Sequence, residues 1–128
     1  KKKIPNNKAK IAILGFSFKE NIPDFRNTKV IHIIHELKKW NVKLEIFDSH
    51  VSKEEVKEKH GISISKSQDI NKKNFDAIIL AVSHKEFIKK LSYYDTLFKN
   101  KNKKILIDIK NNFLEKDLIK KNYNFFQL

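Results

Sequence analysis

Short apolar runs separated by polar stretches predict the strands of a buried sheet. Residues 10–14 end in the run IAIL, and residues 77–82 read AIILAV, with no polar alternation in either run. Such runs are typical of parallel strands that helices cover on both faces. Residues 105–109 (ILIDI) form a similar run with a single acid, and apolar positions alternate over residues 42–46 before Asp48. We expect a strand at each of these four places.

Helical patterns lie between these strands. Val30, Ile33, Ile34 and Leu37 recur at i, i+3, i+4 and i+7, which predicts a helix over 27–40. Asn27 or Thr28 would cap its first turn.

Three later stretches place a Ser or Asn three residues before a Glu, the spacing of a capping box at a helix start. They are Ser52 with Glu55, Ser83 with Glu86, and Asn112 with Glu115. The first predicts a helix that stops at Gly61, the second a helix that runs through Leu91, and the third a helix over 116–121. A short edge strand at 62–64, a single helical turn at 67–71 and an edge closed by Phe125 and Phe126 complete the expected pattern.

Strands alternating with helices define the expected fold class. We predict a Rossmann-like, doubly wound α/β domain with a mainly parallel sheet, in a three-layer α/β/α arrangement. Residues 1–9 are polar and contain Pro5, so we expect a lead-in or linker there, with the domain itself spanning 10–128. A linker would imply further protein upstream.

Composition narrows the function classes. The chain contains no cysteine, which excludes a disulfide framework, a thiolate metal site and a thiol nucleophile within it. No apolar run reaches the roughly 18 residues of a membrane span and no signal-peptide pattern opens the sequence, so we expect a soluble, cytoplasmic protein. The net charge is +13, but Arg26 is the only arginine among the 28 basic residues. This balance disfavours nucleic-acid binding, which relies on arginine for base contacts.

The segment from Gly15 to Arg26 is the strongest candidate site. It joins a buried strand to a helix, the position where open α/β sheets bind ligands. A single Gly15 replaces the G-x-G-x-x-G pattern, so this is not the usual NAD-binding turn. Lys19 offers a point charge for a phosphate, and Asp24 with Arg26 could form an ion pair that holds the loop. A solvated loop with a local ion pair is the alternative.

Four segments together resemble one family. The stretch GFSFKENIPDFRNTKVIHIIHELKKWN, followed by IFDSHV, DAIILAVSHKEF and ILIDIKN, resembles the C-terminal, UDP-binding domain of the UDP-glucose/GDP-mannose dehydrogenase family. The resemblance covers residues 10–112. The loop text FKENIPDFRN and the histidine in AVSHKEF are most similar to bacterial enzymes that act on UDP-N-acetylhexosamines.

The resemblance implies a part of a larger enzyme. In this family an N-terminal domain binds NAD, a middle segment forms the homodimer, and a cysteine upstream of this domain assists oxidation of the C6 alcohol to a uronic acid for surface polysaccharides. This chain would then bind the UDP-sugar and contact the remaining dehydrogenase domains. We expect no bound cofactor, no metal and no catalytic residue in the chain itself.

The resemblance also assigns residue roles. Phe18 and Lys19 match loop positions that contact the substrate, whereas Asp24 and Arg26, with Gly15, match positions that structure the loop. Lys110 stands where the family commonly has an arginine. It keeps the charge and loses the bidentate fork, so we expect a substrate contact with altered geometry.

Other polar residues carry weaker hypotheses. Asp48 ends a strand, where a turn role is favoured over ribose binding because the glycine pattern is missing. His84 follows a central strand, in a site-like position, but a structural role within the capping box is favoured. His32 and His35 could form half of a metal site, but a helix surface is favoured. Aromatic residues that indicate core or a domain interface are Phe87, Tyr93, Tyr94 and Phe98. The alternative function is a basic α/β module that binds nucleic acid or a partner protein.

Overall fold

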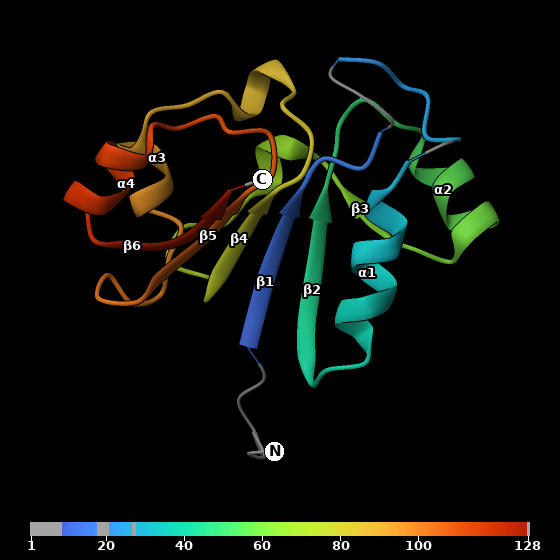
Figure 1. Ribbon diagram of the computed structural model, residues 1–128. Helices are drawn as coiled ribbons and strands as arrows, with labels where there is room; N and C mark the ends of the chain where they lie inside the picture. Colours follow the sequence, from blue (N-terminus) through green and yellow to red (C-terminus); the bar gives the residue numbers. More distant parts are fainter. Residues whose placement is uncertain (1–8, 18–20, 27, 128) are drawn as a thin grey trace.

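The structure is a computed structural model that describes residues 9–17, 21–26 and 28–127. Six strands form one sheet in the order β3-β2-β1-β4-β5-β6, and every neighbouring pair is parallel (Figure 1). The strands are β1 (Ala9–Leu14), β2 (Val42–Phe47), β3 (Ile64–Ser65), β4 (Ala77–Leu80), β5 (Lys104–Asp108) and β6 (Tyr123–Gln127). The predicted doubly wound α/β class is confirmed, and so are the four main strands.

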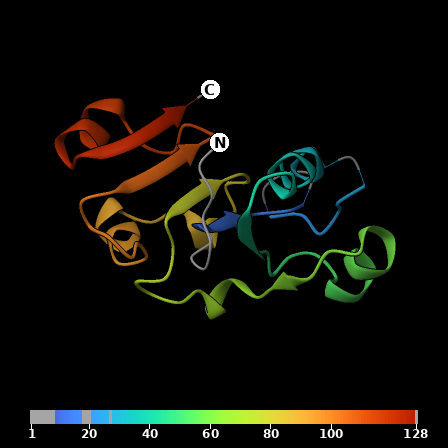
Figure 2. The same ribbon diagram turned by 90° about the horizontal axis from the view of Figure 1, so that it is seen from below.

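Helices cover both faces of this sheet. On one face, α1 (Val30–Lys38) and α2 (Lys53–His60) pack Ile34 and Val56 against the sheet. On the other face, α3 (Leu91–Asp95) and α4 (Glu115–Lys120) contribute Tyr94 and Leu118 to a second cluster. Seen from below, α1 and α3 lie on opposite sides of the central strands (Figure 2). The chain adds strands first on one side of β1 and later on the side where β4 lies. Because crossovers between parallel strands are right-handed, the helices of the two halves must cover opposite faces of the sheet.

The central strands are buried because they have strand partners on both sides and helices over both faces. Ala12, Ile13 and Leu14 of β1 are fully buried, and Leu14 pairs with Phe47 on one side and Leu80 on the other. Successive side chains point to opposite faces of a strand, so both helical layers need apolar partners. This is why the runs in β1 and β4 show no polar alternation.

One predicted capping box is confirmed. The Ser52 hydroxyl accepts a hydrogen bond of 3.2 Å from the backbone N–H of Glu55, at the start of α2. The helix ends at Gly61, whose φ of +69° is the left-handed conformation that favours glycine. Helix α1 begins at Val30, later than expected. The Thr28 hydroxyl accepts from the N–H of Val30, and Asn27 lies outside the described residues.

The other two capping predictions were wrong. A short 3₁₀ turn, η2 (Lys85–Phe87), follows β4, and α3 starts only at Leu91. The Ser83 hydroxyl donates to the Asn112 side chain instead, and Glu86 accepts from Ser67 and contacts His50. Since Asn112 bonds Asp108 and Ser83, α4 begins at Glu115 without a side-chain cap. Hydrogen bonds to residues distant in the sequence thus replace the local capping hydrogen bonds.

The weaker predictions are confirmed with small shifts of boundary. The edge strand is β3 (Ile64–Ser65) and the helical turn is η1 (Ser67–Asp69). Phe125 and Phe126 belong to β6, the opposite edge strand. Within the described residues, no helix combines the length and the apolar character that crossing a membrane requires.

Candidate functional site

The strand order changes direction between β1 and β4, and the β1–α1 loop leaves the sheet at this point. The chain runs from β1 through α1 to β2 on one side, whereas β4 lies on the other side. In open α/β sheets a crevice forms at the carboxyl ends of the strands at such a switch point. The predicted loop therefore lies where the topology places a ligand site.

Gly15 allows β1 to end in close contact with the residues after β4. Its φ is +105°, a backbone conformation that residues with a side chain rarely adopt. Its N–H donates to the carbonyl of Phe47 at 2.8 Å. A Cβ on this glycine would lie 2.5 Å from the Val82 Cβ and 2.8 Å from the Val82 backbone nitrogen. Both the backbone conformation and the contact therefore require glycine.

A cleft of about 400 Å³ opens at this edge of the sheet. Its walls come from the loop, the start of α1 and the segments that follow β4 and β5. The residues are Ser17, Thr28, Lys29, Val30, Ile33, Ala81, Val82, Ile109 and Lys110. Two exposed lysines, Lys29 and Lys110, flank the cleft beside the first turn of α1. Helix N-termini and ammonium groups both favour an anion, so the cleft suits a phosphate.

The structure brings only part of the predicted site together. Lys110 lines the cleft with Ser17, so the turn after β5 and the β1–α1 loop face the same space. Phe18 and Lys19, the two predicted loop contacts, lie outside the described residues. Their roles stay predictions.

Asp24 and Arg26 form a local ion pair further along the loop. Two guanidinium nitrogens donate to the Asp24 carboxylate at 3.0 and 2.9 Å, and the Arg26 N–H donates at 2.9 Å. These hydrogen bonds with Arg26 lower the pKa of Asp24 to about 2. The Arg26 side chain is 82% exposed, so the pair acts within the loop and contributes little to global stability.

Asp48 has a larger role than a turn residue. Its Oδ1 accepts from the N–H of His50 at 2.7 Å, which is the predicted turn. Its Oδ2 accepts from the backbone N–H groups of Phe16 and Ser17 at 2.6 and 2.9 Å. Burial acts to raise the pKa of Asp48, but the hydrogen bonds from His84, Phe16 and Ser17 together hold it below its usual range. The carboxylate at the end of β2 therefore anchors the start of the β1–α1 loop.

His84 completes this anchor from the end of β4. Its Nε2 lies 2.8 Å from the Asp48 carboxylate, and its Nδ1 accepts from the N–H of Asn21 at 2.8 Å. Because a backbone N–H can only donate, Nδ1 carries the lone pair and Nε2 carries the proton. The hydrogen bonds thus assign the neutral Nε2–H tautomer.

A second histidine lies on the outer side of this pair. The ring of His50 stacks on that of His84 with centroids 4.1 Å apart, and its Nε2 lies 3.0 Å from Glu86. Glu86 also accepts from the Ser67 hydroxyl. Burial acts to raise the pKa of Glu86, and the contacts with His50 and Ser67 hold it below the usual value. The stacked ring closes one side of His84.

The remaining sequence candidates occupy structural positions. His32 and His35 are exposed on α1, as a helix surface predicts, and the described residues contain no group of three His, Cys, Asp or Glu side chains that could hold a metal ion. Phe87, Tyr94 and Phe98 are core residues, and Tyr93 packs against that core while half-buried. The Tyr94 hydroxyl donates to the carbonyl of Phe87.

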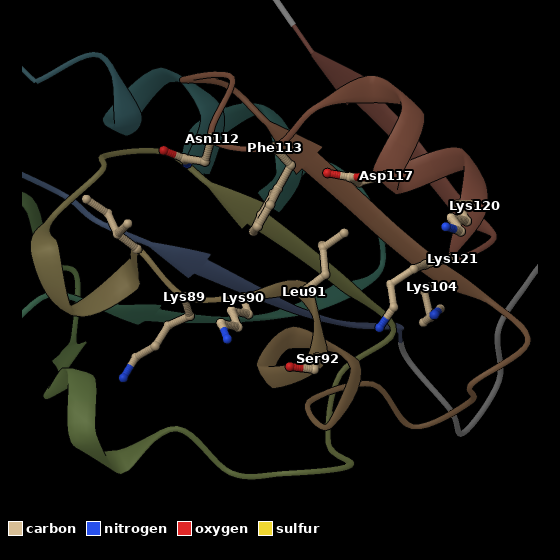
Figure 3. Close-up of a pocket in the computed structure, with 11 residues that line it drawn as sticks. Lys89, Lys90, Leu91, Ser92, Lys104, Asn112, Phe113, Asp117, Lys120 and Lys121 are labelled. Carbon is tan, nitrogen blue, oxygen red and sulfur yellow. The ribbon is translucent and has the colours of Figure 1, made fainter.

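A wider groove of about 940 Å³ lies away from the loop, between α3 and α4 (Figure 3). Five lysines surround an apolar floor of Leu91 and Phe113; they are Lys89, Lys90, Lys104, Lys120 and Lys121. Asp95 already pairs with two of them, Lys104 at 3.2 Å and Lys121 at 2.8 Å. Part of the charge around this groove is therefore neutralised from within the fold.

The fold is that of a Rossmann-like domain with a lysine-flanked cleft at its switch point. A sequence profile described as the UDP-glucose/GDP-mannose dehydrogenase family, UDP binding domain, matches residues 12–115. The chain belongs to this family. It is 41% identical over 110 residues to a UDP-N-acetyl-D-glucosamine 6-dehydrogenase of Salmonella typhi, covering 86% of this chain and 25% of that protein.

A further relative agrees with this assignment, and a solved structure shares the fold. Protein CapL of Staphylococcus aureus is 38% identical over 102 residues, which are 80% of this chain and 23% of CapL. Among solved structures, the NDP-N-acetyl-D-galactosaminuronic acid dehydrogenase of Methanosarcina mazei superposes with a TM-score of 0.78 at 22% identity, covering 94% of this chain and 24% of that one. The chain thus spans about a quarter of the length of the relatives it matches.

Proposed function

We propose that this chain is the UDP-sugar-binding domain of an NAD-dependent nucleotide-sugar 6-dehydrogenase. The whole enzyme would oxidise the C6 alcohol of the sugar to a uronic acid for surface polysaccharides. NAD would bind to other parts of the enzyme, and the reactive cysteine would come from there, since this chain has none. The chain by itself would bind the UDP-sugar without oxidising the sugar.

The observation that carries this proposal is the cleft between the β1–α1 loop and Lys110. Lys110 and Lys29 line this cleft and would meet the diphosphate as point charges, and the first turn of α1 would add its partial positive charge. Ser17 supplies a buried polar wall to the same cleft. The resemblance adds Phe18 and Lys19 as substrate contacts from the loop.

An NMR titration of this chain with UDP and GDP tests the proposal, with Lys110→Ala and Lys120→Ala compared. Lys120 lines the groove of Figure 3 and is the matched control for charge. We expect UDP to shift the amides of residues 15–17, 28–30 and 109–111, and Lys110→Ala to weaken binding roughly five- to tenfold, the loss of one charge-assisted contact. Lys120→Ala should leave it unchanged.

The same titration separates the alternative function. If single-stranded DNA binds with a steep salt dependence and shifts the groove between α3 and α4, and UDP shifts nothing near Ser17, the chain is a basic binding module. If Lys110→Ala and Lys120→Ala weakened the binding of UDP equally, the proposed site would also be contradicted, because net charge alone would then explain the binding.

A further inference from the structure

Two fully buried polar side chains stand on either side of β1. Asp48 follows β2 and His84 follows β4, and both side chains are 0% exposed. Polar groups are buried at a cost unless hydrogen bonds satisfy them, so the partners of such a pair show what it holds in place. Here most partners belong to the β1–α1 loop, at the carboxyl edge of the sheet.

Asp48 fixes the beginning of this loop. Its Oδ2 accepts from Phe16 and Ser17, the two residues after Gly15, and from His84. Ser17 is buried and lines the cleft that we propose binds UDP. The carboxylate therefore determines the position of one wall of the cleft.

His84 fixes a second point further along the loop. Its Nδ1 accepts from the N–H of Asn21, and the Asn21 side chain accepts from the N–H of Lys85 at 3.0 Å. Asn21 has a φ of +58°, a left-handed conformation in which asparagine is one of the few favoured residues. Two hydrogen bonds thus tie Asn21 to the segment that follows β4.

The geometry does not fit an acid–base pair. Both ring nitrogens of His84 already have partners within the protein, and the stacked ring of His50 and the tilted ring of Phe87 lie beside it. A substrate proton has no route to a ring that is fully buried and fully hydrogen-bonded. The pair is suited to holding backbone in place.

We propose that Asp48 and His84 are positioning residues of the UDP site. They fix the chain at Ser17 and at Asn21, on both sides of the two residues to which the family resemblance assigns substrate contacts. This inference rests on the proposed function. A backbone held at these two points before the ligand arrives loses less conformational freedom on binding, so replacing either residue of the pair should weaken the binding of UDP.

Two replacements of His84 distinguish a role in positioning the loop from a role in the stability of the fold. In His84→Gln, the amide N–H can take the place of Nε2–H and keep the bond to Asp48, while the acceptor for Asn21 is lost. In His84→Asn, the carbonyl oxygen can take the place of Nδ1 and keep the bond to Asn21. The Nε2 contacts with Asp48 and with the Ser17 hydroxyl, 3.1 Å away, are lost. His35→Gln, at an exposed position of α1, is the matched control.

The experiment measures the Kd for UDP and the urea midpoint of unfolding for each variant of this chain. We expect His84→Gln to raise Kd at least fivefold with the smaller loss of midpoint, and to shift the Asn21 amide resonance. We expect His84→Asn to show the larger loss of midpoint and a smaller rise of Kd than His84→Gln, because Asp48 still accepts from the Ser17 N–H. His35→Gln should change neither quantity.

The outcomes distinguish the two proposals. If wild type does not bind UDP, the proposed function fails, and this inference fails with it. If wild type binds UDP but His84→Gln binds equally well, or if Kd follows the loss of midpoint in both variants, the positioning role alone is wrong. Long-range ¹H–¹⁵N spectra give an independent readout, because a protonated Nδ1 of His84 in the wild type would also overturn the inference.

Discussion

Gly15 and Val82 approach each other so closely that no side chain fits between them. The missing Cβ of Gly15 would lie 2.5 Å from the Val82 Cβ, and the φ of +105° is itself unfavourable for other residues. Gly15→Ala should therefore destabilise the domain by about 3 kcal/mol, from strain and overpacking together. Urea unfolding followed by circular dichroism measures this.

Gly61 provides the control for that prediction. It also has a positive φ, +69°, but a Cβ there would meet nothing within 4 Å. Gly61→Ala should cost only about 1 kcal/mol, the backbone contribution alone. Equal losses for the two variants would show that the contact with Val82 is unimportant.

Acid should weaken the fold partly through Asp48. The pKa of Asp48 is lowered in the folded state from its ordinary value of 3.8, so its contribution to stability is complete above that value and is lost as the pH falls below it. In Asp48→Asn the decline of the unfolding free energy between pH 5 and pH 2 should be shallower. Because other carboxylates also titrate in this range, the measurement is the difference between the two pH profiles, and identical profiles would contradict the prediction.

Lys110→Arg tests how the turn after β5 meets the nucleotide. Lys110 is exposed on the cleft, and arginine can offer two parallel N–H donors to a phosphate where lysine offers a single charge. If Lys110 contacts the diphosphate, Lys110→Arg should bind UDP as tightly as wild type or up to roughly tenfold more tightly, as one further charge-assisted bond allows. Isothermal titration calorimetry measures the Kd, and a loss as large as that of Lys110→Ala would argue against a phosphate contact.

Asp95 should matter for stability and not for UDP binding. It accepts from Lys121, Lys104 and the Tyr123 hydroxyl, and the Lys104 ammonium lies over the Tyr123 ring. Asp95→Ala would leave a buried lysine without its carboxylate, which should cost about 2 kcal/mol. Glu36→Ala, which breaks an exposed pair with Lys39, should change the unfolding free energy by less than about 0.5 kcal/mol. A reduced affinity for UDP in Asp95→Ala would contradict this division.

The fold could be predicted from the sequence because the apolar runs coincide with the strands that are buried in the sheet. The runs in β1 and β4 are buried on both faces, and Gly61 ends α2 through a local conformation that one residue determines. The failed helix after Ser83 shows the limit. Glu86 was expected at a cap, but its carboxylate meets His50, 36 residues away in the chain. Local spacing carries no information on such a partner.

The site could be predicted only in part for the same reason. The loop after β1 and the position of Lys110 follow from strand ends, which the sequence marks. The bond between Asp48 and His84 depends on β2 and β4 lying on opposite sides of β1, a consequence of strand order. Both residues stand at strand ends, and that shared position was the signal that could have joined them.

The central place of β1 also affects the order in which the domain can fold. Residues 9–65 contain β1, β2 and β3, but the other neighbour of β1 is β4, and Ile11 pairs with Ala77, far along the chain. Pairings between distant residues form slowly because a long loop must close first. We therefore expect β1, β2 and β3 to pair before β4 joins them as the chain leaves the ribosome. The cleft, which needs Ser17, Val82 and Lys110 together, should be among the last features to be completed.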